Sequence, residues 1–458
     1  MVKELLDAYD VEDIKTMAAA HFWPHSRQAG DMSDETGIKL VVRGEGSYVQ
    51  DAAGKQWFDL ISGMWLKNAG HGRREIADAV YEQMLEISYT PGGSVSPVTA
   101  RLAAKLASLS PDPDSRVYFC SGGAEAVETA LKMSRKYHKN NGEPGRFKFI
   151  ARRGSYHGAT FMNMSLGGGS VASGSDYGPL MPYAVNIAQP GEYRCRLCRG
   201  MSACDLECAR DLEIAIQNEG PSTVAAFIAE PISVASGVHV PHPEYWPTIR
   251  EICDKYGVLL ICDEVITGFG RTGKWFATEH WGIKPDIFTV AKALTSGYLP
   301  IGAAVAGKNV ADAFIGDQAS TFRHLITFGG NPPACAAGLA NLEIMEREDL
   351  VGNSARLGEY LFDRAQSLFE HPIVGDVRGG LGLLVSLEFV KDRATKEKFS
   401  ADANLMQLAS AEMSKEGLLG RVMGDVMHLA PPLSTTRDEL DELVEKVDRV
   451  IGAVEAQI

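Results

Sequence analysis

Three short segments of the chain carry residue types that could perform chemistry together. The first runs from Arg116 into Ser121-Gly122-Gly123 and then into a strongly helical stretch, so a strand leads through a glycine turn into a helix. Glycines let a backbone approach a ligand closely, and the free N–H groups at the start of a helix favour phosphate. Isolated glycine turns are common, so this segment alone leaves a phosphate site and a plain strand-to-helix turn equally open.

The other two segments each place a charged side chain after an apolar run. Asp263 and Glu264 follow Val258–Cys262, at the sheet edge where ligands bind in open α/β sheets. A carboxylate there could cap a helix, which is the commoner role, bind a metal or pair with a cationic ring nitrogen. Lys292 follows Ile287–Val290. A lysine in this position usually reaches the surface, whereas a partly buried amine loses its proton more easily and can form an imine.

Together the three segments supply a phosphate cradle, an acid and an amine at strand ends. Catalysis with pyridoxal 5′-phosphate (PLP) requires this combination, because the phosphate anchors the cofactor and the acid keeps its pyridine nitrogen protonated. The amine holds the aldehyde as a Schiff base and later moves protons. The sequence therefore predicts a PLP enzyme with Lys292 as the Schiff-base lysine and Asp263 as the acid.

Over nearly its whole length the chain resembles the class III (ω-) aminotransferases of PLP fold type I. The most specific match is the run Leu259–Gly273, which is followed by Pro285-Asp-Ile and by Ala291-Lys-Ala. Shorter matches lie at residues 120–125, 155–158, 229–232, 327–332 and 378–382. The resemblance implies an α/β fold, a PLP cofactor and transamination.

The resemblance also implies site residues. It places the backbone N–H groups of Gly122, Gly123 and Ala124 around the phosphate, although the family usually has serine where Gly122 stands. The other residues implied at the cofactor are Tyr156 and Val265 on opposite faces of the ring, His157 beside Tyr156, Asp263 at the ring nitrogen, and Glu230 near Asp263. Thr327 would reach the phosphate of the neighbouring subunit, which implies a homodimer with shared sites and leaves a tetramer open.

Substrate recognition is expected from aromatic residues and one arginine. Trp65 matches the family's active-site rim, and Trp23 and His25 would add to the same wall; simple loop packing is the alternative for Trp23. Arg421 aligns with a mobile arginine that clamps a carboxylate with two hydrogen bonds, the alternative being a solvated surface arginine. The predicted reaction is ping-pong transfer of an amino group from an ω-amino acid, a diamine or a primary amine to pyruvate or another 2-oxo acid.

Three other functions stay open at this stage. The same fold could serve a PLP-dependent aminomutase or a decarboxylating dialkylglycine-type enzyme. The chain could also be a non-catalytic PLP-binding protein. The presence of Lys292, Asp263 and Tyr156 disfavours this alternative. A nicotinamide oxidoreductase is disfavoured, since no G-x-G-x-x-G follows the first strand.

Four cysteines form a group that these functions do not use. Cys195, Cys198, Cys204 and Cys208 are spaced C-x2-C-x5-C-x3-C within an insertion, residues 191–210. Four thiols can enclose Zn²⁺ or hold an iron–sulfur cluster, while reduced thiols or disulfides are the alternatives. No metal ligands are assigned from the sequence alone.

The elements that must position these residues form an α/β pattern. Helical stretches alternate with short apolar runs from residue 71 to 330, which predicts a large PLP-binding domain with a mostly parallel sheet flanked by helices. Residues 1–70 and 331–458 are expected to build a smaller α+β domain together. A net charge of −14 disfavours nucleic-acid and anionic-membrane partners, and with no apolar span or targeting segment the expected location is the cytoplasm.

Overall fold

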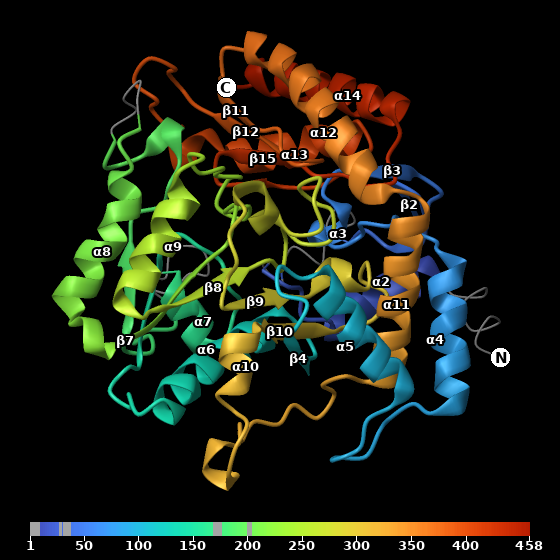
Figure 1. The fold of residues 1–458 in the computed structure, drawn as a ribbon. Coiled ribbons are helices and arrows are strands. Elements are labelled where there is room, and N and C mark those ends of the chain that lie inside the picture. The colour runs from blue at the N-terminus through green and yellow to red at the C-terminus, as the bar shows by residue number, and fades with distance from the viewer. Residues whose placement is uncertain (1–9, 27–29, 31–37, 168–175, 199–203) are drawn as a thin grey trace.

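A mixed sheet with helices on both faces forms the centre of the molecule (Figure 1). The computed structural model describes residues 10–26, 30, 38–167, 176–198 and 204–458. The seven strands are, in spatial order, β4 (Arg116–Cys120), β10 (Gly302–Ala306), β9 (Ile287–Val290), β8 (Leu259–Asp263), β7 (Val224–Ala229), β5 (Lys148–Arg152) and β6 (Ala184–Ile187). The strands from β9 to β6 are parallel, and β10 runs antiparallel to both β9 and β4. The predicted mostly parallel α/β sheet is confirmed.

Apolar side chains on both faces explain why these strands are buried. One face packs against α6 (Gly123–Asn140), through residues such as Val127 and Leu131. The opposite face packs against α8 (Glu207–Glu219) and α9 (Tyr245–Tyr256). Since the parallel strands all point the same way, the residues that follow β7, β8 and β9 meet at one edge of the sheet.

Further helices surround this core. α11 (Pro332–Arg347) packs against α4 (Arg74–Glu86) and α5 (Pro97–Leu109). In the described residues, the remaining α-helices are α2 (Val11–His21), α3 (Ser62–Trp65), α7 (Phe161–Leu166), α10 (Lys308–Asp312), α12 (Leu350–Ala365), α13 (Leu405–Lys415) and α14 (Arg437–Glu455). Within the described ranges, none of the helices has the length and apolar character needed to cross a bilayer.

Two four-stranded sheets lie above the central sheet in the view of Figure 1. The first has the order β1 (Val41–Glu45), β2 (Tyr48–Asp51), β3 (Gln56–Asp59) and β13 (Leu418–Leu419). The second has the order β11 (Val374–Gly379), β12 (Val385–Phe389), β15 (Val426–Leu429) and β14 (Val422–Met423). Parallel pairing of β3 with β13 joins the early hairpin to the C-terminal part of the chain. This pairing agrees with a small domain built from both ends, whose boundaries at 70 and 330 stay a prediction.

Candidate active site

A cavity of about 300 Å³ opens at the edge of the central sheet where β7 and β8 end. The predicted site residues that line it are Gly123, Ala124, Tyr156, His157, Glu230, Asp263, Val265 and Lys292. These residues come from five separate stretches of sequence, and the parallel strands bring them together. The cavity is large enough for a cofactor-sized ligand.

Lys292 lies in a tight turn directly after β9. Its backbone has a φ of 44°, and its half-buried side chain lines the cavity. Burial lowers the pKa of the amine to about 8, although the carboxylates of Asp263 and Glu230 act in the opposite direction. An amine with this pKa is partly neutral near pH 7, as a nucleophile must be.

The turn that carries Lys292 is held by α11. Asn341 donates hydrogen bonds from Nδ2 to the carbonyl oxygens of Ala293 and Leu294, at 2.9 and 3.1 Å. Ser296 donates to Asn341 Oδ1 at 2.6 Å and accepts from the backbone N–H of Ala69 at 2.9 Å. Asn341 and Ser296 therefore connect the lysine turn to the segment that follows Trp65.

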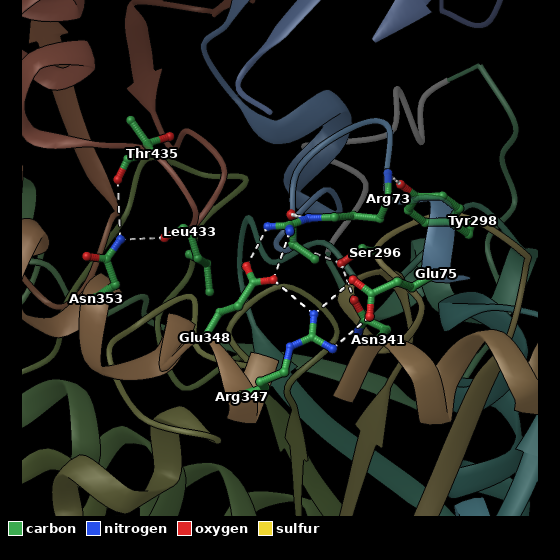
Figure 2. A network of polar contacts seen from close by, with 11 residues as sticks. Arg73, Glu75, Ser296, Tyr298, Asn341, Arg347, Glu348, Asn353, Leu433 and Thr435 are labelled. Atoms are coloured by element: carbon green, nitrogen blue, oxygen red, sulfur yellow. Dashed lines mark hydrogen bonds and ion pairs between the residues drawn. The ribbon is translucent and has the colours of Figure 1, made fainter. Parts of the chain in front are cut away.

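Ion pairs between the start of α4 and the end of α11 lie beside this connection (Figure 2). Arg73 makes two hydrogen bonds to the Glu348 carboxylate, at 2.9 and 2.8 Å. Arg347 makes two more to Glu75, at 2.7 and 2.8 Å. Paired guanidinium–carboxylate contacts of this kind fix the relative orientation of two helices.

Three hydrogen-bonding groups hold the Asp263 carboxylate in place. Its Oδ1 accepts hydrogen bonds from the Val265 N–H at 3.1 Å and from Thr289 Oγ1 at 3.0 Å. Its Oδ2 lies 2.7 Å from His157 Nδ1. His157 Nε2 is buried and has no hydrogen-bond partner in the described part of the chain. The carboxylate is thus oriented before any ligand binds.

Glu230 lies beside Asp263 and fixes the backbone at Tyr156. Its Oε1 accepts a hydrogen bond from the Tyr156 N–H at 2.7 Å, whereas its buried Oε2 has no partner among the described residues. Burial raises the pKa of Glu230, and the nearby charges of His157 and Arg152 oppose that rise. Glu230 therefore positions the residue whose ring lines the cavity.

The glycine turn before α6 approaches the cavity closely. A Cβ on Gly123 would lie 2.9 Å from Val265 Cγ1, so no larger residue fits there without displacing Val265. Gly122, by contrast, has open space where a Cβ would be, and it caps α6 without a side-chain hydrogen bond. The first N–H groups of this 18-residue helix are available to an anion.

Trp65 brings the amine and the arginine together. Lys292 Nζ lies 5.8 Å and Arg421 Cζ 5.7 Å from the centre of the Trp65 ring. Trp65 is buried and has a φ of 58°, a backbone conformation that a bulky residue rarely adopts. Arg421 Nε is also buried without a hydrogen-bond partner in the described residues. The side chains of Trp65 and Arg421, both predicted to bind substrate, therefore lie next to the cavity.

Three residues predicted to belong to the active site do not line this cavity in the single chain. Trp23 is 86% exposed, and His25 is exposed with it. Thr327 lines a separate surface cavity with residues 89–96, 325–326 and 329–332. One chain alone does not bring these side chains to Lys292.

Arg271 supports the turn that carries Trp65, a role that the sequence did not predict. It is fully buried and donates through Nη1 to the carbonyl oxygens of Leu383 and Pro431, at 3.0 and 2.7 Å. Through Nη2 it donates to Ser62 Oγ at 2.9 Å and to Asn68 Oδ1 at 2.7 Å. It thus connects both sides of the turn that carries Trp65 to the C-terminal part of the chain.

These residues fit PLP. The cavity has helix N–H groups for a phosphate, a fixed carboxylate for a ring nitrogen and a buried amine for an aldehyde. The unpartnered His157 Nε2 and Glu230 Oε2 belong to two residues of its lining and leave polar capacity for a ligand.

Comparison with known proteins agrees with this geometry. The family model for class-III aminotransferases matches residues 31–451. The taurine–pyruvate aminotransferase of Bilophila wadsworthia is 38% identical over 98% of both chains, and the putrescine–pyruvate aminotransferase of Pseudomonas aeruginosa is 36% identical over 93% of both.

Solved structures give the same result. A thermostable (S)-enantioselective ω-transaminase from Thermomicrobium roseum is 40% identical with a TM-score of 0.93, covering 98% of this chain and 99% of that one. A PLP-bound amine transaminase from an uncultivated Pseudomonas species is 38% identical with a TM-score of 0.90, covering 94% and 98%. This chain therefore belongs to the class-III aminotransferase family, the PLP-dependent transaminases of fold type I.

Proposed function

We propose that this transaminase takes its amino group from an ω-amino acid, a diamine or another primary amine and gives it to pyruvate or another 2-oxo acid. The observation that carries the proposal is the placement of Lys292 Nζ and Arg421 Cζ over the same Trp65 ring. A substrate that reacts at Lys292 can then reach the guanidinium with a carboxylate. Relatives named for taurine, putrescine and pyruvate support this choice of substrates.

Each predicted cofactor residue has a proposed task. When bound, PLP withdraws electrons from the substrate carbon that loses its proton. The Gly122, Gly123 and Ala124 N–H groups bind the phosphate, and Asp263 holds the proton on the ring nitrogen. Tyr156 and Val265 hold the two ring faces, while His157 and Glu230 fix Asp263 and the Tyr156 backbone. Lys292 Nζ would hold the cofactor aldehyde and, as a free amine, would carry the substrate proton.

Arg421→Ala is expected to separate the two substrate classes. A bidentate arginine–carboxylate contact contributes about 1.5–3 kcal/mol, so kcat/KM for pyruvate should fall by roughly 10–100-fold. The value for a simple amine without a carboxylate should change less than about threefold. Steady-state kinetics of both half-reactions measure the difference, and an equal loss for both substrates would contradict the clamp.

A panel of amine donors tests the proposed function directly. The purified holoenzyme is incubated with pyruvate and with ω-amino acids, diamines or aryl-alkyl amines, and free alanine is measured. Alanine without CO2 supports transamination, whereas CO2 release would point to the decarboxylating alternative and an isomerised donor without alanine to the aminomutase. Failure with every donor would favour a non-catalytic PLP-binding protein.

Gly122→Ser is expected to strengthen cofactor binding. The position has room for a side chain, and a serine there can both cap α6 and donate a hydrogen bond to a phosphate. We expect the dissociation constant for PLP to fall by about 3–10-fold. Equilibrium titration of the apo-enzyme measures it, with Gly122→Ala as the control that adds a Cβ without a hydroxyl. Equal affinities of the two variants would show that the hydroxyl makes no contact.

We also propose a homodimer with shared active sites. Large apolar side chains are exposed on α4 and on the loops around Thr327, among them Tyr81, Leu85, Val95, Leu325 and Phe328. Such a group of exposed apolar residues suits a protein interface. Thr327 lies within it, where it could reach the partner's phosphate site. Light scattering after size-exclusion chromatography measures the mass and separates dimer from tetramer.

Mixing two inactive or weakened subunits tests the sharing of sites. Lys292→Ala lacks its own lysine, and Thr327→Ala would lack the contact that it gives to its neighbour. A mixed dimer regains one complete site, so refolding the two variants together should restore PLP affinity at up to half of the Lys292-containing sites. No gain over the separate variants would contradict the proposed role of Thr327.

The proposed location is the cytoplasm. No disulfide joins any of the eight cysteines, which suits a reducing compartment. Fractionation of the producing cell, followed by activity measurement in each fraction, tests this location; the negative net charge also agrees with small-molecule substrates rather than nucleic acid.

A further inference from the structure

A second group of reactive side chains lies outside the active-site cavity. The cysteine cluster consists of Cys195, Cys198, Cys204 and Cys208. Cys195 and Cys198 follow the short helix Glu192–Arg194, and Cys208 lies in the first turn of α8. Three of these thiols are buried and Cys204 is half-buried. Transamination requires none of them.

Two of the four sulfur atoms lie in contact. Cys198 Sγ lies 3.7 Å from Cys204 Sγ, and the Cys198 N–H donates to Cys195 Sγ at 3.3 Å. Cys195, Cys198 and Cys208 are buried in the same apolar cluster, and Cys204 packs against it. Two thiolates that share a tetrahedral zinc ion at about 2.3 Å lie about 3.8 Å apart. The Cys198–Cys204 distance of 3.7 Å is close to this value.

Positive charge lies beside the cysteine cluster. Arg152 is fully buried, and its Nε and Nη1 have no hydrogen-bond partner in the described part of the chain. The N-terminus of the 13-residue helix α8, whose first turn holds Cys208, adds a partial positive charge. A zinc ion with four thiolates has a net charge of −2, which the helix end and the guanidinium would partly offset.

We propose that Cys195, Cys198, Cys204 and Cys208 bind one structural Zn²⁺ ion. Binding converts four thiols to thiolates and releases four protons to solvent. Among the described residues, no three His, Cys, Asp or Glu side chains already surround a common point, so the sulfurs must draw in by side-chain rotation. Four sulfur ligands close the coordination shell, which makes the ion structural and leaves no open position for catalysis.

The contacts next to the cysteine cluster indicate what the ion would stabilise. Arg194, adjacent to Cys195, pairs with Glu388 on β12 and donates to the Lys396 carbonyl at 2.8 Å. Lys396 Nζ donates in return to the Tyr193 carbonyl at 2.7 Å. Zinc would therefore fasten α8, which packs on the central sheet, to a turn anchored on the C-terminal sheet.

Metal analysis of the purified holoenzyme tests the proposal. Cells are grown with added zinc, the protein is purified without chelators, and metals are measured by inductively coupled plasma mass spectrometry. We expect about one zinc per chain in the wild type and in the matched control Cys335→Ala, a buried thiol on α11. Cys198→Ala should lose at least about 80% of the zinc and melt at a lower temperature.

Further outcomes decide the assignment even if Cys198→Ala does not fold. Cobalt added to chelator-treated wild type should give the intense visible bands of tetrahedral thiolate coordination. A wild type without zinc and without these bands would overturn the proposal. So would iron with visible charge-transfer absorbance, or an intact mass showing a disulfide between these cysteines.

Discussion

Lys292→Ala is expected to lower kcat by more than about 10³-fold, because the variant loses both the covalent anchor and the proton carrier. Lys292 is the only lysine among the residues that line the cavity, so no other side-chain amine can take its place. Steady-state alanine formation with a good donor measures the loss. The matched control is Lys284→Ala, an exposed lysine at the opposite edge of the sheet, which should keep full activity.

Two observations would sharpen this result. Added methylamine should partly restore proton transfer in Lys292→Ala, since a small amine can enter the space left by the side chain. Multiple turnovers without any added amine would rule out Lys292 as the essential base.

The same lysine predicts a pH dependence. The neutral amine is the reactive form, and its fraction rises with pH through the pKa of about 8. Apo-enzyme should therefore capture PLP faster as the pH rises from 6 to 9, reaching half of the maximal rate near pH 8. Stopped-flow absorbance measures this rate, and a midpoint near the ordinary lysine value would show that burial does not lower the pKa.

Arg271→Met is expected to have the second large effect, on stability and on substrate binding. The variant leaves the Leu383 and Pro431 carbonyls and the Ser62 and Asn68 side chains without their donor. Burial lowers the pKa of Arg271 to about 9, because removing the charged guanidinium from water costs free energy. Part of the stabilisation from the four hydrogen bonds compensates for that cost. We expect the free energy of unfolding to fall by about 3–5 kcal/mol.

The kinetic result should follow from the position of Trp65. Ser62 and Trp65 both have positive φ, and without the guanidinium this turn can relax. KM for the amine should rise more than kcat falls, because Lys292 keeps its own support from Asn341. Arg347→Met is the control: it breaks exposed ion pairs and should cost about 1 kcal/mol or less. Similar losses in both variants would show that Arg271 has no special role.

The sequence predicted those parts of the fold that depend on local patterns. The continuous apolar runs of β7, β8 and β9 are typical of buried parallel strands, and they located Asp263 and Lys292 correctly at one sheet edge. β10 was missed, because Gly-Ala-Ala-Val-Ala has little strand propensity. Its composition has a tertiary cause: a Cβ on Gly302 would lie 2.6 Å from the Gly122 carbonyl oxygen.

The sequence did not predict the long-range hydrogen bonds, because they too depend on tertiary structure. Arg271 and Asn341 look ordinary in the sequence, since their roles depend on carbonyl groups supplied by distant segments. The roles of Trp23, His25 and Thr327 remain predictions, because an isolated chain leaves them away from the cavity. A resemblance to a family supplies the identity of such residues, while only coordinates supply their partners.

The parallel pairing of β3 with β13 has a consequence for synthesis on the ribosome. The last strand of the central sheet is complete once residue 306 has left the exit tunnel, but β3 waits for residues 418–419. Throughout that interval the nascent chain presents an unpaired strand edge, the kind of surface that chaperones cover. Translation arrested before residue 418 should therefore yield a protease-resistant central sheet with a protease-sensitive N-terminal hairpin.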